Sequence, residues 1–437
     1  MTRTFLILLF FISISIQAQE IWSLAKCIDH AMENNINLNL TKNKIKTQKV
    51  NTFEAKANLL PSLNLGSGLG VSWGRNIDGN TNEVTFDQTI GNNYWIESSM
   101  TFFQGFVKYN TISYNNYMLK ASKKESEKEL NSLVMNILSA YYKVIYSKEL
   151  ENVAQDQVDL SKSLVKRMEK LVEVGRESGI TIQELKSQWA NDKLILSRAA
   201  NNTMNAILEI KQLLRLNESD DFNIDLIDLQ LFSVTPAPQT DSVYNNALSI
   251  MPEIKQQEYL LKASKKSLAM SRGLISPRLN VSARIGTNYF NGNSVDFTDQ
   301  IENNQNKSVF VGLTIPIFNS ASTYSKIKKN KISLQDQELL LEQKKDNLYA
   351  NIRYAINDLE SAKNEYFAST ELQEYSKLTL KNATKKLEKG LASTTDFDVA
   401  KQRFTSAEAE LIKSKLMYIM RNYTIIFYQT GNWKHVY

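Results

Sequence analysis

The chain has 437 residues, of which 42% are hydrophobic, and only 15 glycines and 6 prolines interrupt it. So few breakers indicate long continuous helices rather than several compact domains joined by many turns. The net charge of +6 arises from 52 basic and 46 acidic residues of well-mixed sign, which argues against a nucleic-acid-binding protein, because such proteins concentrate basic residues in patches. One cysteine and two histidines are too few for a zinc site made of these residue types alone.

The first 18 residues have the layout of a secretory signal peptide. Arg3 precedes an apolar run over residues 5–16, and Ile16-Gln17-Ala18 offers a small-residue cleavage site. No later stretch reaches the about 18 apolar residues of a membrane-spanning helix. If the exported chain enters a membrane, we therefore expect it to do so with strands.

Four segments alternate between apolar and polar residues, at 62–73, 94–103, 279–289 and 308–318. A period of two places the two sets on opposite faces of a strand. Each segment has about the length of a tilted strand that crosses an outer membrane. Aromatic residues near the ends, such as Trp73, Trp95 and Phe102, are candidates for interfacial girdles, and Phe102 is expected on the same face as Met100. A soluble antiparallel sheet with one solvent-exposed face remains the alternative interpretation.

Four strands cannot close into a barrel, since the small known barrels have about eight. Unpaired backbone N–H and C=O groups at the edges of a sheet are not tolerated inside the lipid bilayer, so the chain is expected to combine with copies of itself. Two copies would leave an interior filled by side chains, and three would leave a water-filled lumen. The residues that would face the interior are small and polar, which favours three copies with a water-filled lumen.

Two very long helices are predicted over 106–174 and 321–389, because neither range contains a proline and apolar residues recur in them at spacings of three and four. Each would extend roughly 100 Å. Gly175 and Gly390 end them, and shorter return helices follow at 182–215 and 396–429. Further helices are expected at 23–59 and at 241–275, the latter with a turn near Pro252.

The same order of elements occurs twice. Pro61 recurs as Pro277, and Gly175 recurs as Gly390, about 215 residues further along the chain. The sequence thus predicts a duplicated helix-strand-strand-helix-helix unit, with a first repeat at 19–235 and a second at 236–437.

This order, the helix lengths and the turn residues resemble the TolC-type outer-membrane efflux and secretion channels. The residues that carry the resemblance are Trp22-Ser23-Leu24 with residues 31–35, their echo at residues 247–253, the prolines that lead from helix into strand, Pro61 and Pro277, and the glycine-led turns at Gly175 and Gly390. The resemblance covers essentially the whole mature chain.

The resemblance implies a homotrimer with a twelve-stranded barrel in outer-membrane lipid and a long α-helical barrel in the periplasm of a Gram-negative bacterium. A periplasmic adaptor (membrane fusion protein) would dock on the turns and connect the channel to an inner-membrane pump or ABC transporter. By position, the docking residues would be Gly175, Arg176, Ser178, Gly390, Leu391 and Ser393.

The resemblance also implies a periplasmic gate ringed by aspartates, and Asp396 stands at one of the family's positions. Thr181 and Val399 stand where other gate acids would be expected, so the ring is expected to be less acidic here. A plain helix N-terminal cap is the alternative role for Asp396, and the two roles are compatible.

We therefore expect a passive conduit in a tripartite efflux or type I secretion system, with no cofactor. A periplasmic or surface coiled-coil protein is the alternative. An exported enzyme is disfavoured, because no acid-base pair, phosphate loop or metal-ligand cluster is recognisable.

Overall fold

The protein is described from a computed structural model, in residues 21–77, 82–86, 88–175, 178–217, 222–225, 237–291 and 295–433. The predicted signal peptide over 1–18 lies outside these residues, as do Arg176 and His435. Two compact units make up the chain. The helical unit comprises Met1–Asn39, Lys128–Met251 and Leu348–Tyr437, and the sheet unit comprises Leu40–Glu127 and Pro252–Asn347. Each unit takes segments from both halves of the sequence.

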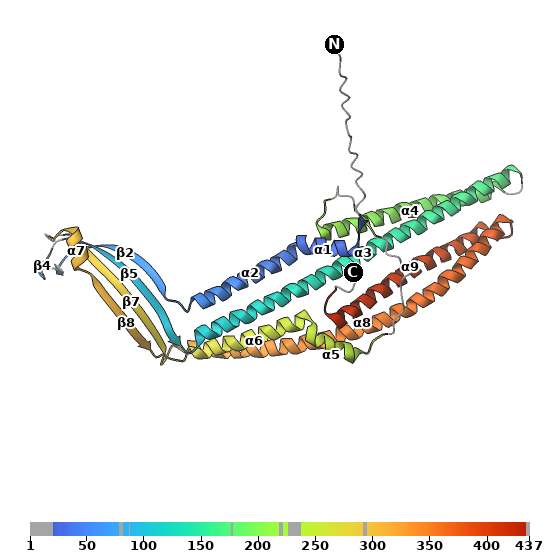
Figure 1. Ribbon diagram of the computed structural model, residues 1–437. Coiled ribbons are helices and arrows are strands. Elements are labelled where there is room, and N and C mark those ends of the chain that lie inside the picture. Colours follow the sequence, from blue (N-terminus) through green and yellow to red (C-terminus); the bar gives the residue numbers. More distant parts are fainter. Residues whose placement is uncertain are drawn as a thin grey trace, which may run out of the picture. The chain divides into compact units, whose positions relative to one another are not determined.

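The sheet unit contains a four-stranded antiparallel sheet in the order β2, β5, β7, β8 (Figure 1). These strands span Ser62–Ser72, Thr89–Gln104, Arg278–Phe290 and Asn306–Thr314. The second strand begins earlier than its predicted range of 94–103, and the fourth ends before its predicted limit at 318. Pro316 accounts for the early end, because proline has no N–H to continue a strand ladder.

One face of the sheet is apolar. The strand register places Leu65 of β2 opposite Ile96 of β5, and Ile96 opposite Ile285 of β7. Register shifts between Thr101 and Phe103, so that Phe103 pairs with Leu279 on the apolar face. The extra residue of this bulge moves the side chains that follow it to the other face, so the alternation of the sequence alone does not give the face of Phe103.

The opposite face carries small and polar residues around Trp95. Gly66 and Gly286 flank Trp95 in its row, and the Arg284 guanidinium lies 5.2 Å from the Trp95 ring centroid. A Cβ atom on Gly66 would lie 2.5 Å from Trp95 Cε2, so only glycine fits beside the indole. Trp95 was expected in an aromatic girdle. Its position on the polar face corrects that expectation.

Short elements join these strands. The connection between β2 and β5 includes the pair β3 (Asn76–Ile77) and β4 (Val84–Thr85), and α7 (Phe297–Asn303) lies between β7 and β8. Gln300 of α7 is buried, donates to the carbonyl oxygens of Phe290 and Val295, and accepts from Phe290 N–H. Its amide thus fastens α7 to the end of β7.

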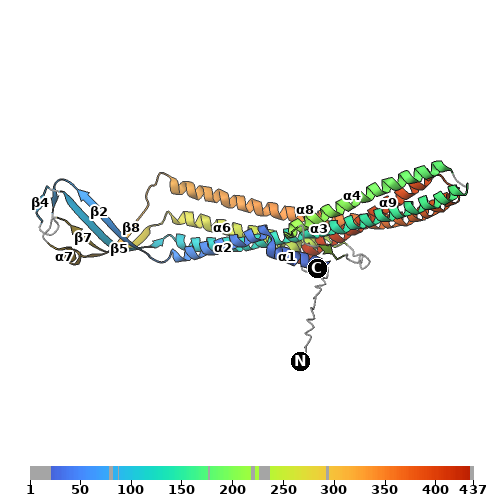
Figure 2. The same ribbon diagram turned by 90° about the horizontal axis from the view of Figure 1, so that it is seen from above.

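Both long helices are present, α3 over Val107–Glu173 and α8 over Ser322–Glu388. In the helical unit, α4 (Gly179–Leu214) returns beside α3, and α9 (Thr394–Thr430) returns beside α8 (Figures 1 and 2). The segment expected as one helix over 23–59 is two helices, α1 (Leu24–Asn34) and α2 (Ile36–Ala57). Asn35 breaks it, since its backbone is extended and its side chain accepts from Leu38 N–H. Near Pro252, α5 (Thr240–Ile250) gives way to α6 (Pro252–Gly273).

A core of aromatic and aliphatic side chains fills the helical unit at the level of α1. Tyr141 at its centre is fully buried, and its hydroxyl donates to the carbonyl oxygen of Asp225 at 2.8 Å. Asp225 follows β6 (Asn223–Ile224), which pairs in parallel with β1 (Ile21–Trp22). None of the helices in the described ranges combines the length and the apolarity needed to cross a membrane.

Candidate functional site

The predicted docking residues that the structure describes, all except Arg176, lie in two helix turns, α3 to α4 and α8 to α9, both in the helical unit. Gly175 and Gly390 have φ angles of +72° and +69°, in the left-handed region that favours glycine. Leu391 N–H donates to the carbonyl oxygen of Lys386 at 2.8 Å, so the second turn closes the end of α8 with a backbone hydrogen bond.

A serine begins each return helix. The Ser178 hydroxyl accepts from Ile180 N–H at 3.2 Å, and the Ser393 hydroxyl accepts from Asp396 N–H at 3.1 Å. Both serines satisfy backbone donors that a helix N-terminus leaves without intrahelical partners. Their position in the turns is therefore explained by helix capping, and any docking role is additional.

Exposed apolar side chains surround the turns. Leu391 is 73% exposed, Val174 is 67% exposed and Ile180 is 72% exposed. Val174 and Ile180 were absent from the sequence-based prediction, although each lies close to Gly175 in the chain. Exposed aliphatic residues beside a tight turn are the signal that would have identified them.

The two turns are held together by a shared core below them. Phe397 is fully buried in this core, and Met168, Leu185 and Leu387 contribute from the other three helices. Polar links accompany the core. Arg167 Nη1 lies 2.8 Å from Glu388 Oε1, and the Thr394 hydroxyl donates to the Glu184 carboxylate. The turns therefore form one structural end of the helical unit.

Asp396 completes a capping box at the start of α9. Its Oδ2 atom accepts from the Ser393 hydroxyl at 2.8 Å and from Ser393 N–H at 3.2 Å. Hydrogen bonds from the Ser393 side chain and backbone lower the pKa of the Asp396 carboxyl. The side chain is exposed and ionised at neutral pH, so the capping role is present in the single chain.

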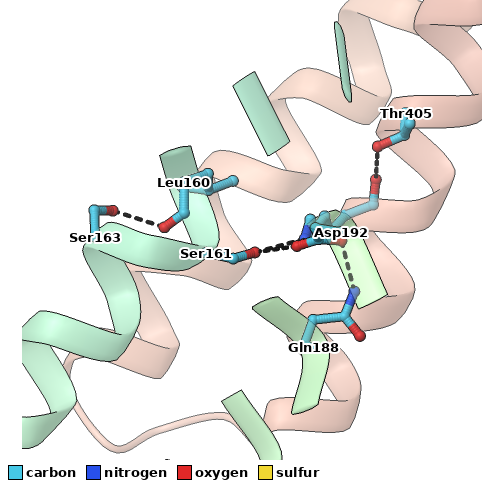
Figure 3. A network of polar contacts seen from close by, with 7 residues as sticks. Leu160, Ser161, Ser163, Gln188, Asp192 and Thr405 are labelled. Carbon is cyan, nitrogen blue, oxygen red and sulfur yellow. Dashed lines mark hydrogen bonds and ion pairs between the residues drawn. The ribbon is translucent and has the colours of Figure 1, made fainter. Parts of the chain in front are cut away.

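A buried ion pair, which the sequence reasoning missed, lies further along these helices (Figure 3). Lys401 Nζ of α9 contacts the Asp192 carboxylate of α4, and it donates to Ser161 Oγ of α3 at 2.7 Å. Ser161 and Gln188 donate to the two oxygens of Asp192. The network joins three helices and gives each charge a partner, which a buried charge requires.

A sequence signal for this network exists. Lys401 falls four residues after the buried Phe397, on the face of α9 that packs inward. Ser161 interrupts the inward face of α3 in the same way, between Val158 and Leu164. Polar residues at core positions of three helices point to a shared buried site.

Cys27 and His30 do not form a reactive pair. Cys27 is fully buried, and burial raises the pKa of its thiol to about 12. His30 packs edge-on against Trp22, with ring centroids 5.3 Å apart. Among the described residues, no three His, Cys, Asp or Glu side chains gather as a set of metal ligands.

Comparison with known proteins identifies the family. The model of the family described as outer membrane efflux protein matches the chain in two parts, residues 27–214 and 243–423. The chain belongs to this family. The two matched parts correspond to the two halves of the duplicated sequence.

Individual relatives agree with this membership. The chain is 24% identical to the cation efflux system protein CusC of Escherichia coli (strain K12), over 79% of this chain and 74% of CusC. It is 19% identical to the outer membrane efflux protein BepC of Brucella suis biovar 1 (strain 1330), over 91% of this chain and 82% of BepC.

Solved structures share the fold. A crystal structure of CusC superposes with a TM-score of 0.81 at 16% identity, covering 94% of this chain and 92% of that chain. The Campylobacter jejuni outer membrane channel CmeC superposes with a TM-score of 0.79 at 17% identity, covering 94% and 88% of the two chains. The mainly helical fold with long helices and a β-sheet is thus the fold of these channels.

The resemblance to TolC-type channels is therefore confirmed. The protein is an outer membrane efflux channel that extends into the periplasm, and it is a transport protein rather than an enzyme. The alternative of a structural coiled-coil protein is set aside. Homology to a component of an efflux system implies partners in such a system.

Proposed function

We propose that the protein is a homotrimeric, passive duct from the periplasm to the exterior in a tripartite efflux or type I secretion system. The observation that carries this proposal is the incomplete sheet. Among the described residues, β2 and β8 each have one edge with no strand paired to it. Leu65 on β2 is 80% exposed, and Val309 on β8 is 75% exposed.

Such a sheet is unsuited to lipid as a single copy. Each unpaired backbone group in hydrocarbon costs several kcal/mol, and apolar side chains on one face favour contact with lipid. Three copies would supply twelve strands and close the edges, with the glycine-rich and polar face around Trp95 turned inward. Outer-membrane lipid would contact the face that carries Leu65 and Val309.

The two helix turns supply the docking surface for a periplasmic adaptor, which connects the duct to an inner-membrane pump or ABC transporter. Gly175, Ser178, Gly390 and Ser393 shape the turns, and the exposed side chain of Leu391 offers apolar contact area. Arg176 is proposed as a docking residue by its sequence position alone. Val174 and Ile180 extend the same apolar surface.

Asp396 is proposed as the gate residue. In a trimer whose turns surround the symmetry axis, three ionised Asp396 carboxylates would form a ring that attracts cations and repels anions. The duplicated repeats at 19–235 and 236–437 would give each subunit two similar turns at this end. Opening would require movement of the turns and of the helices that carry them.

The test of the duct proposal uses the purified full-length protein in detergent. Light scattering should give the mass of three chains, and addition to a planar lipid bilayer should give discrete conductance steps. A monomer that stays in solution without detergent and produces no conductance would contradict the proposal.

A further inference from the structure

A cleft of about 500 Å³ opens in the helical unit between α3, α4 and α9. Its polar end lies toward the turns and is formed by Gln157, Asp192, Asp398 and Lys401. Its other end is mainly apolar, with Leu150 and Val153 from α3, Ile195 and Ala199 from α4, and Ala409 from α9. Arg198 and Asn202 stand exposed at the rim of that apolar end. The volume falls within the range of small-molecule sites, about 300–1,000 Å³.

Two acceptors in the polar end have no hydrogen-bond donor. Gln157 is 7% exposed, and neither its Oε1 atom nor Asp398 Oδ1 has a hydrogen-bond partner among the described residues. Buried polar atoms in native proteins normally have a partner. Both atoms can only accept, so the missing partner is a donor.

The charges at this end favour a positively charged donor. Lys401 forms an ion pair with Asp192, and its Nζ also donates a hydrogen bond to Ser161 Oγ. Asp398 brings a second carboxylate, and no ion pair to it is formed within the described ranges. Two carboxylates face one ammonium in a partly buried space.

We propose that this cleft binds a small organic cation, a primary ammonium that carries a short apolar tail. The ammonium donates to Gln157 Oε1 and Asp398 Oδ1, and the tail lies along Leu150, Val153 and Ile195. This site goes beyond the proposed duct, because an open conduit requires no binding site between the helices of its wall. Burial raises the pKa of the Asp398 carboxyl, as expected for an acid without a full counter-charge.

The probe is hexylammonium chloride, added to the full-length protein in detergent and followed by isothermal titration calorimetry. Binding should saturate at one site per chain. Hexanol and sodium hexanoate, which keep the tail but lack the positive charge, should bind at least tenfold more weakly. Comparable binding of hexanol would show that only the apolar surface contributes and would overturn the proposal.

Asp398→Asn keeps the shape of the side chain and removes its charge, so it should weaken hexylammonium binding roughly tenfold to a hundredfold. Glu410→Gln is the matched control, because Glu410 is an exposed carboxylate of the same helix outside the cleft lining. It should bind as the unaltered protein does. Equal binding by all three proteins would also overturn the proposal.

Gln157→Leu provides a second, independent variant. It removes the other acceptor at similar volume and should weaken binding by a comparable factor. Circular dichroism and the oligomeric mass of each variant verify that the helices and the assembly are intact. A folded Gln157→Leu protein that binds hexylammonium unchanged would count against the site.

Discussion

Lys401 of α9 and Asp192 of α4 form an ion pair whose side chains are each only 4% exposed. Ser161 and Gln188 donate hydrogen bonds to Asp192, and Ser161 also accepts one from Lys401. Both charges are therefore buried but have hydrogen-bond partners. A buried pair of this kind adds little net stability over apolar residues, but the loss of one partner is costly. Its position between three helices makes it a determinant of how α9 packs on α3 and α4.

Replacing Lys401 alone should therefore be strongly destabilising. Lys401→Met leaves the Asp192 carboxylate buried without its counter-charge, and we expect a loss of about 3–5 kcal/mol. Thermal unfolding followed by circular dichroism measures the change. Lys413→Met, which removes an exposed lysine paired with Glu410, should cost less than about 1 kcal/mol. The double variant Lys401→Met with Asp192→Leu should recover most of the stability. Equal losses of stability in Lys401→Met and in Lys413→Met would contradict the assignment.

Asp398→Asn should stabilise the helical unit at neutral pH. Desolvation by burial raises the folded-state pKa of Asp398, while Lys401 opposes the shift and Asp192 and Glu184 add to it. The folded protein thus holds this proton more tightly than the unfolded chain, and stability declines as pH rises from the ordinary carboxyl pKa of about 3.9 toward the raised value. The asparagine variant lacks this decline. Its advantage in melting temperature should be greatest at pH 7 and should narrow below about pH 4; a pH-independent difference would argue against the titration of Asp398.

Asp396→Asn tests the proposed gate. Hydrogen bonds from Ser393 hold the pKa of Asp396 below its usual value, so the carboxylate is ionised at neutral pH. Its replacement should lower the cation selectivity of channels in planar bilayers and increase conductance. Asp159→Asn, an exposed change on α3 where the carboxylate accepts from Gln155, serves as the control. Unchanged conductance and selectivity would leave Asp396 with the capping role alone.

Leu391→Glu together with Gly390→Arg tests the docking surface. The φ angle of Gly390 is unfavourable for arginine, and a carboxylate at position 391 replaces an exposed apolar contact with charge. Crosslinking to a periplasmic adaptor that binds the unaltered channel should be abolished, while the mass of the trimer in detergent stays the same. Crosslinking at the level of the unaltered protein would refute the docking role.

Gly66→Ala should disturb the polar face of the sheet. The added Cβ atom would lie 2.5 Å from Trp95 Cε2, so the indole must move, at a cost of about 1–3 kcal/mol. Gly70→Ala on the same strand is the control, because its nearest atom, the carbonyl oxygen of Gly91, would be 3.9 Å away. Tryptophan fluorescence and the heat stability of the assembly should change in the first variant and not in the second.

Much of this architecture follows from local features of the chain. Helices of 67 residues form where proline and glycine are absent, and each ends at a glycine whose backbone enters the left-handed region. Alternation of period two in residues 62–72 and 278–290 is enough to predict strands with one apolar face. These features depend on residues that are neighbours in the sequence, so they are readable without a fold.

Other features depend on residues that meet only after folding. The register shift before Phe103 arises from pairing with β7, far along the chain, and reassigns an aromatic side chain to the other face. Lys401, Asp192 and Ser161 each resemble part of a solvated helix face when taken singly, because lysine, aspartate and serine are common there. Packing of three helices removes water from all of them at once, and this shared burial turns ordinary surface residues into the ion pair beside the cleft.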